Sequence, residues 1–225
     1  MKTYIYYVML TAAIIVFAGC NREQKIQITK TSISMQDSLY SIDTEKSVFS
    51  TTSKKLDNSL NELNNRLDSI YNSNSEQLQA RAKEDAQFME NGMGYELLMR
   101  DSVFMATDKL ISLRILTYTY AGGAHGNTMF SAINYAPQSL QFLTTDNIFN
   151  ANATAEIDSL LVKHFNNEDG CFWEKPTVAK ASAINIGNSE VTFIYNQYEL
   201  GAYSCGPATV NIPLNEIEPY MILAK

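Results

Sequence analysis

Residues 110–135 read LISLRILTYTYAGGAHGNTMFSAINY, and this stretch decides the fold class. Apolar residues alternate with other types through residues 110–120, which is the period of a strand with one buried face. The glycine-rich segment at residues 121–127 breaks the alternation, which resumes through residues 129–135. Glycine allows the positive φ angles that a tight connection requires. The stretch therefore predicts two consecutive strands joined by a short loop.

Helices and further strands surround this predicted hairpin. Leucine and isoleucine recur every three or four residues through residues 56–70, which places one apolar stripe along a helix. The pattern lasts about two and a half heptads, fewer than a coiled coil needs, so a helix packed on a sheet is favoured. Asn72-Ser-Asn-Ser75 interrupts the stripe and predicts a second helix or a kinked continuation. Other helices are expected at residues 154–165 and 215–221, and other strands at residues 26–35, 38–49, 95–105, 179–186, 191–195 and 208–213.

This order of elements indicates an α+β fold. Runs of hairpins separated by helices, without regular βαβ units, are typical of an antiparallel sheet with packed helices. We expect a small N-terminal strand-and-helix subdomain at residues 26–94. A larger α+β domain is expected to follow at residues 95–225.

The N-terminus has the pattern of an export signal. Lys2 precedes the apolar run VMLTAAIIVFAGC at residues 8–20, and small residues stand directly before Cys20. The segment resembles a bacterial lipoprotein signal, which predicts removal of residues 1–19, lipidation of Cys20 and a tether at residues 20–25. A membrane helix is the alternative, but the run is shorter than the roughly 20 apolar residues that span a bilayer. The expected location is the bacterial cell envelope, lipid-anchored and facing the periplasm or the cell surface.

The charge balance narrows the class of partner. The formal net charge is −7, and no block of Lys or Arg stands against it. Nucleic acid and anionic lipid surfaces are therefore expected to be poor partners, and we expect no nucleic-acid partner. A basic protein would be attracted, and the expected membrane attachment is through the N-terminal lipid alone.

Two cysteines remain once Cys20 is assigned to the lipid. Cys171 and Cys205 form an even pair in a chain expected to leave the cytoplasm, where disulfides persist. A bridge between them would close a loop of about 35 residues and contribute roughly 3–4 kcal/mol. Two separate buried thiols are the alternative. Neither cysteine has a CxxC neighbour or a nearby histidine, so we expect no metal and no cofactor, and Trp173 is expected to pack on the bridge.

Two segments resemble a known family. The first is TYTYAGGAHGNTMFSAINY at residues 117–135. The second is VTFIYNQYELGAYSCGPATVNIPLNEIEPYM at residues 191–221, which contains the run Tyr-x(4)-Tyr-x-x-Gly-Pro from Tyr198 onward. Together they resemble the extracellular domain of the RsiV anti-sigma factor family, a module that also occurs beside the catalytic domain of the peptidoglycan deacetylase PdaC. The half before Tyr95 is similar in layout to the smaller domain that precedes this module.

The resemblance implies a binding function. Proteins of the RsiV type are receptors for lysozyme, and an acidic module suits such a basic partner. This chain is expected to lack both the signalling part and the deacetylase domain. We therefore expect a lipid-anchored, non-enzymatic extracytoplasmic module that recognises a lysozyme-like protein or a cell-wall glycan.

The candidate binding residues are the glycine-rich loop and two tyrosines. Gly122, Gly123 and Gly126 around His125 form a loop whose amides could contact an anion or a ligand carbonyl. The loop could equally be a tight hairpin that His125 only shapes, or a catalytic loop. That last reading gives the alternative function, a small cell-wall-modifying hydrolase built around His125.

Two tyrosines and the second histidine complete the candidates. Tyr198 and Tyr203 stand close together among glycines, where aromatic side chains suit sugar stacking or a protein interface. Sheet packing is the alternative role for both rings. His164, the second histidine, shares a helix face with apolar residues and is expected to pack in the core.

Overall fold

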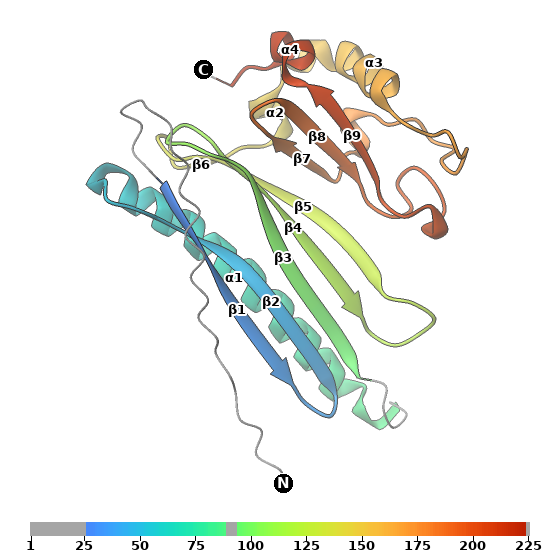
Figure 1. Ribbon diagram of the computed structural model, residues 1–225. Coiled ribbons are helices and arrows are strands. Elements are labelled where there is room, and N and C mark those ends of the chain that lie inside the picture. Colours follow the sequence, from blue (N-terminus) through green and yellow to red (C-terminus); the bar gives the residue numbers. More distant parts are fainter. Residues whose placement is uncertain (1–25, 89–93, 224–225) are drawn as a thin grey trace. The chain divides into compact units, whose positions relative to one another are not determined.

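The computed structural model describes residues 26–88 and 94–223, and the expected signal, lipidation site and tether lie outside them (Figure 1). The strands are β1 (Ile26–Gln36), β2 (Tyr40–Thr51), β3 (Tyr95–Ala106), β4 (Ile111–Tyr120), β5 (Asn127–Ala136), β6 (Gln141–Phe142), β7 (Ala183–Ile186), β8 (Glu190–Tyr195) and β9 (Ala208–Pro213). The helices are α1 (Lys54–Glu84), α2 (Thr145–Ile148), α3 (Thr154–His164) and α4 (Leu214–Ile217). One sheet has the strand order β1-β2-β3-β4-β5-β6 and the other has β7-β8-β9. The fold is α+β, as the sequence predicts. No helix within the described ranges is long and apolar enough to cross a membrane.

The chain divides into two compact units. Of the described residues, unit 1 contains those up to Asp101 together with Leu116–Thr128, and unit 2 contains Ser102–Ile115 and those from Met129 onward. The sequence predicts a boundary between residues 94 and 95, whereas this division falls inside β3. A 12-residue strand such as β3 is about 40 Å long, so its two ends can belong to different cores.

Unit 1 is built on the β1–β2 hairpin and the helix α1. The hairpin is antiparallel, with register from Ile26 opposite Thr51 to Gln36 opposite Ser41. In Figure 1 the helix α1 lies along this hairpin. The apolar stripe of α1 is buried as predicted. The side chains of this stripe with almost no exposed surface are Leu56, Leu60, Leu63 and Leu67.

The sheet is not wholly antiparallel. The strand β2 pairs parallel with β3, from Tyr40 opposite Tyr95 to Glu45 opposite Arg100. The prediction of an antiparallel sheet is therefore wrong at this pair. A helix between two strands lets the chain return to the starting edge and run in the same direction, and α1 is such a crossover.

The helix α1 also runs without a break through Asn72-Ser-Asn-Ser75. The side chains of that segment bond backward along the helix: Asn74 Nδ2 donates to the carbonyl of Ile70 at 2.8 Å, and Ser75 Oγ donates to the carbonyl of Tyr71 at 2.9 Å. Asparagine and serine usually favour turns because they compete for backbone groups. Here they bond the i−4 carbonyls of an intact helix, and the helix continues to Glu84.

Side chains satisfy the backbone of β2 where its pairing with β3 ends. The Ser47 N–H donates to Asp101 Oδ2 at 2.8 Å, and the buried Asp101 carboxylate is also paired with Lys30. Two residues on, the Phe49 N–H donates to Asn64 Oδ1 at 2.9 Å, and Asn64 Nδ2 donates to the Phe49 carbonyl at 2.8 Å. The amide of Asn64 therefore takes the place of a neighbouring strand at this edge.

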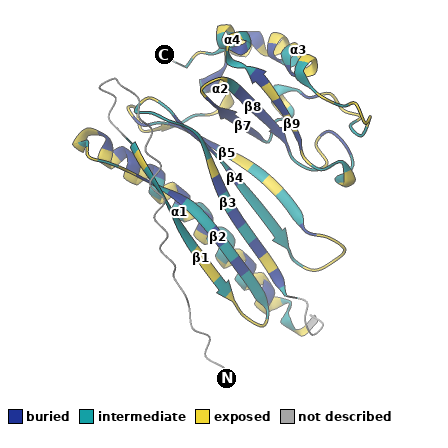
Figure 2. Ribbon diagram, in the orientation of Figure 1, coloured by how far each residue is buried: buried dark blue, intermediate teal, exposed yellow. Residues whose placement is uncertain are grey.

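Unit 2 has its core between the β7-β8-β9 sheet and the helices α3 and α4. Both strand pairs of this sheet are antiparallel, and β7 and β8 are buried along most of their length (Figure 2). The sequence predicts a strand over the whole of residues 179–186, but the strand begins only at Ala183, after a short 3₁₀ turn. The fully buried core side chains include Leu161, Val191, Phe193, Tyr195, Val210, Ile212 and Ile217.

Candidate functional site

The glycine-rich loop lies in unit 1, between β4 and β5. Gly122 and Gly123 have φ angles of +81° and +98°, in the left-handed region that favours glycine. The Tyr120 hydroxyl donates to the Gly123 carbonyl at 3.0 Å. Two of the three glycines thus have a conformational reason for being glycine, which is to close the turn.

Gly126 has a packing reason. It is buried, and a Cβ atom at this position would lie 2.3 Å from the ring of Tyr118. His125 is exposed, and its Nδ1 atom lies 3.0 Å from the Gly126 carbonyl oxygen. The imidazole is therefore available to solvent at a loop whose backbone is fixed by its neighbours. Within the described ranges, no group of three or more His, Cys, Asp or Glu side chains is placed to hold a metal ion.

A disulfide joins two surface segments of unit 2. Cys171 and Cys205 are bridged, with their Cα atoms 5.7 Å apart, as predicted. Phe172 forms a β-bridge with Gly201, and the Trp173 N–H donates to the Leu200 carbonyl at 3.1 Å. The segments around residues 171–174 and 200–205 are thus held together by one covalent link and by backbone hydrogen bonds.

Gly201 allows the two segments to approach closely. A Cβ atom there would lie 3.0 Å from the ring of Phe172, 3.1 Å from the Cys171 carbonyl oxygen and 3.2 Å from Cys205 Sγ. Any larger residue would have to displace backbone or the disulfide. The glycine is therefore required by the packing around the bridge.

Three aromatic side chains lie on or next to the disulfide-linked segments, and we call them the aromatic surface: the exposed Trp173 and Tyr198 and the half-buried Tyr203. Trp173 has 69% of its surface exposed and Tyr198 has 65%. The rings of Tyr198 and Tyr203 are 5.8 Å apart and tilted toward each other. Tyr198 has a φ of +73°, an uncommon conformation for a non-glycine residue. The expectation that Trp173 packs on the disulfide is wrong, because most of the indole faces solvent.

Acidic side chains accompany the aromatic surface. Glu168 and Asp169 precede Cys171, and Glu199 follows Tyr198. All three are exposed, and none has an ion-pair partner among the described residues. A cavity of about 390 Å³ lies beside them, with the disulfide and the acidic loop in its wall. Its lining residues are Asn166, Asn167, Glu168, Asp169, Cys171, Phe172, Ser204 and Cys205.

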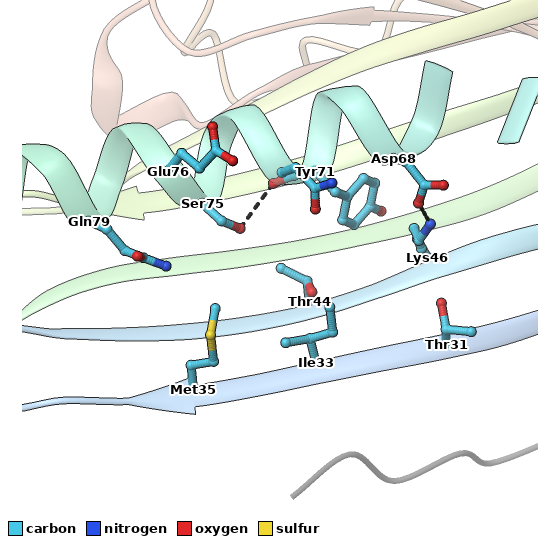
Figure 3. Close-up of a pocket in the computed structure, with 11 residues that line it drawn as sticks. Thr31, Ile33, Met35, Thr44, Lys46, Asp68, Tyr71, Ser75, Glu76 and Gln79 are labelled. Carbon is cyan, nitrogen blue, oxygen red and sulfur yellow. Dashed lines mark hydrogen bonds and ion pairs between the residues drawn. The ribbon is translucent and has the colours of Figure 1, made fainter. Parts of the chain in front are cut away.

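A second hollow lies in unit 1, between α1 and the β1–β2 hairpin (Figure 3). Its volume is about 500 Å³. Ile33 and Met35 of β1 form its apolar side, and Lys46 of β2 is paired with Asp68 of α1 across it. Burial lowers the pKa of the Lys46 ammonium group, and the negative charge of Asp101 offsets part of this effect. The ion pair occupies the charges that a ligand would otherwise meet, so this hollow is a weaker candidate than the aromatic surface.

His164 lies near the surface of unit 2, where it contacts Glu216. The prediction that it packs in the core is wrong. The His164 Nε2 atom lies 3.0 Å from Glu216 Oε2, and Lys163 Nζ donates to the same oxygen at 2.7 Å. The hydrogen bonds from Lys163 and His164 hold the pKa of the Glu216 carboxyl below its ordinary value of 4.5. This group ties α3 to α4, and its role is structural.

The structure therefore brings two of the candidate residues together. The rings of Tyr198 and Tyr203 form a pair, and the disulfide joins Cys205, two residues after Tyr203, to Cys171, two residues before Trp173. The glycine-rich loop belongs to unit 1. Sequence reasoning missed Trp173 as an exposed residue and missed the acidic side chains Glu168 and Asp169. The polar run at residues 166–170 after α3 was the available signal, because such runs form surface loops.

Two family matches and two solved structures agree with this fold. Residues 33–128 match the family described as Deacetylase PdaC, and residues 139–215 match the family described as Protein of unknown function (DUF3298). No curated protein matches the chain. A DUF3298 family protein of Bacteroides fragilis superposes with a TM-score of 0.64 at 19% identity, covering 89% of this chain and 95% of that one. A DUF3298 family protein of Pseudomonas aeruginosa superposes with a TM-score of 0.60 at 14% identity, covering 90% of this chain and 96% of that one.

These matches support the predicted resemblance only in broad terms. The chain contains a PdaC-like segment and a DUF3298 segment, which together indicate an extracytoplasmic-type module of unknown function. At identities below 20%, the solved structures show the fold alone.

Proposed function

We propose that the chain is a lipid-anchored, non-enzymatic binding module that recognises a lysozyme-like basic protein or a cell-wall glycan. The anchor would be Cys20, with the module facing the periplasm or the cell surface. The observation that supports the proposal most is the aromatic surface beside the disulfide.

Exposed aromatic side chains on a rigid support favour recognition. Trp and Tyr bury a large area on binding at a small cost in side-chain entropy, and they dominate the energetics of many interfaces. Trp173 and Tyr198 expose most of their surface, although aromatic side chains of this size are usually well buried. The disulfide and the backbone bonds to Leu200 hold their segments in place, so little ordering is needed when a partner binds.

The charge next to the aromatic surface suits a basic partner. Glu168, Asp169 and Glu199 are exposed and have no ion-pair partner within the described ranges. Unpaired carboxylates at the rim of an interface raise the association rate of a cationic protein, and salt screens this effect. A neutral glycan would use the same rings for stacking but would not respond to these charges.

Binding of the full chain in detergent to lysozyme and to soluble peptidoglycan fragments tests the proposal. The variant Trp173→Ala removes one ring, and Tyr198→Asn removes the other while keeping a residue that tolerates positive φ. We expect each to weaken binding by tenfold or more, since buried aromatic anchors contribute about 2 kcal/mol or more. Val162→Ala, on the exposed side of α3, is the matched control and should leave affinity unchanged.

The charge variant separates the two ligand classes. In Glu168→Gln/Asp169→Asn, association with lysozyme should slow and lose part of its salt dependence, while binding of glycan fragments should not change. Equal affinity of wild type, Trp173→Ala and Tyr198→Asn for both ligands would contradict the proposal. Hydrolysis or deacetylation of peptidoglycan by the wild-type chain, abolished by His125→Ala, would replace it with the hydrolase alternative.

A further inference from the structure

Arg114 is held between two aromatic rings. Its guanidinium carbon lies 5.3 Å from the ring centre of Phe104 and 5.2 Å from that of Phe130. Phe104 is on β3, Phe130 is on β5, and β4, which carries Arg114, lies between these strands in the sheet. The two rings therefore flank the cation from opposite sides, and all three residues belong to unit 2.

The hydrogen-bond donors of Arg114 have no acceptor in the described part of the chain. No hydrogen bond or ion pair joins its guanidinium to any described residue, and the guanidinium carbon lies over the two rings. Arginine carries five N–H donors in a planar fork. Among the described residues, the buried side-chain atoms without a partner are the amide oxygens of Asn134 and Asn185, so the guanidinium nitrogens of Arg114 keep access to solvent. The guanidinium carbon thus lies over both rings, while its nitrogens keep access to solvent.

The backbone of Phe130, which carries the ring on the β5 side of Arg114, is held in place by hydrogen bonds. The Phe130 N–H donates to Asn196 Oδ1 at 2.7 Å, and Asn196 Nδ2 donates to the Phe130 carbonyl at 3.1 Å. The Asn196 N–H in turn donates to Ser182 Oγ at 3.1 Å. The backbone that carries one ring is thus fixed at both its donor and its acceptor, which restricts the orientation of the cation beside it.

We propose that Arg114, between Phe104 and Phe130, forms a binding site for the carboxylate group of a ligand. A carboxylate matches the planar guanidinium fork with two parallel N–H···O bonds. The carboxylate would bind the guanidinium N–H groups, away from the negative faces of the two rings, and an apolar group attached to it could contact the rings.

The surroundings favour an anion over other ligands. Burial lowers the pKa of Arg114, although arginine remains charged at any physiological pH. A partly desolvated cation without an acidic partner is unfavourable, and the rings offset this only in part. An incoming carboxylate supplies the missing acceptors, whereas a cationic ligand would be repelled. This inference does not depend on the proposed function, because a positive site would not attract the basic partner proposed for the aromatic surface.

Titration of the isotope-labelled full chain in detergent, followed by nuclear magnetic resonance, tests the site. The probe is N-acetyl-alanyl-alanine with a free carboxylate, and its C-terminal amide is the matched ligand control. We expect the acid to shift the Nε–H signal of Arg114 and the backbone amide of Ile115 with saturation, and the amide to shift neither. Inorganic phosphate is the third arm and should bind more weakly than the dipeptide acid.

Four variants locate the interaction. Arg114→Gln should weaken the dipeptide acid at least tenfold, and Arg114→Lys, which keeps the charge but loses the fork, should weaken it severalfold. Phe130→Leu should also weaken it, since the ring that orients the guanidinium is lost. Arg66→Gln on α1 removes an exposed arginine and should change nothing.

Three results would overturn the proposal. They are equal binding of acid and amide, tighter binding of phosphate than of the dipeptide acid, and equal affinity in Arg114→Lys and wild type. The circular dichroism spectrum and melting temperature of each variant show whether it is folded. Arg114→Lys keeps the charge and most of the volume, so it remains informative if Arg114→Gln does not fold.

Discussion

Breaking the Cys171–Cys205 bridge should destabilise unit 2 by an amount that follows from the length of the closed loop. The bridge joins residues 34 apart in sequence. In the loop-entropy account, −2.1 − 1.5R ln n gives about −12.6 cal/mol/K for this loop, which is about 3.8 kcal/mol at 25 °C. For a chain of this size, 1 kcal/mol shifts the melting temperature by about 2–4 °C. We therefore expect reduction to lower the melting temperature by roughly 8–15 °C.

Reduction tests the bridge more directly than substitution, because it leaves both sulfur atoms in place. Substitution of Cys205 would also remove the sulfur atom that packs closely against Gly201, where an added Cβ atom would lie only 3.2 Å from it. The assay is calorimetry of the full chain with and without a dithiol reductant, together with alkylation of the unfolded, unreduced protein. Neither Cys171 nor Cys205 should be alkylated before reduction. The double variant Cys171→Ala/Cys205→Ala is the control, and its melting temperature should not respond to the reductant.

The aromatic surface supplies a second measurement for the same perturbation. Trp173 and Tyr198 stand on the two segments that the bridge joins, so reduction should also loosen their placement and weaken ligand binding. A fall in melting temperature of less than about 2 °C would refute the loop argument, since it corresponds to no more than about 1 kcal/mol. Alkylation of either cysteine before reduction would refute the bridge itself.

Two further predictions concern groups that hold elements together. Asn64→Ala should destabilise unit 1 by about 2–3 kcal/mol in denaturant unfolding, because it leaves the N–H and the carbonyl of Phe49 without partners; a loss below 0.5 kcal/mol would show that water replaces the amide. Glu216→Gln should lower the melting temperature at neutral pH, where the carboxylate is ionised and bound by Lys163 and His164. Since the folded-state pKa of Glu216 lies below 4.5, this stabilisation is present above that value and is lost as the pH falls below it. The difference between variant and wild type should therefore vanish in melts at low pH, and a constant difference would contradict this reasoning.

Local patterns predicted most elements because they depend on residues close together in sequence. The stripe of α1 and the alternation in β4 are such patterns, and the structure buries Leu63 and Leu113 as they require. The parallel pairing of β2 with β3 was missed, since a single crossover helix among hairpins leaves no regular repeat in the sequence. The uninterrupted course of α1 was missed for a different reason. Asparagine and serine are correctly associated with turns, but their alternative bonds to the i−4 carbonyls cannot be distinguished from sequence.

The candidate sites were harder to predict because long-range contacts create them. Arg114 stands in a strand pattern where it would be taken for an ordinary solvent-facing residue. Its flanking rings come from positions 104 and 130, and only the order of the strands places them on either side. Trp173 was placed against the disulfide because it is two residues from Cys171. In the structure its N–H bonds Leu200, and the side chain turns to solvent.

The amides of Asn64 and Asn196 bind the edges of two strands in the same way. Each donates to and accepts from the backbone of one strand residue, Phe49 and Phe130 respectively, at a position where a neighbouring strand would otherwise pair. Asn196 also stands two residues before Tyr198, directly after β8 ends at Tyr195. The same side chain therefore holds the backbone of Phe130, which flanks Arg114, next to the start of the loop that carries Tyr198. Loss of Asn196 should consequently disturb both proposed sites, whereas Arg114→Gln and Tyr198→Asn should each disturb only one.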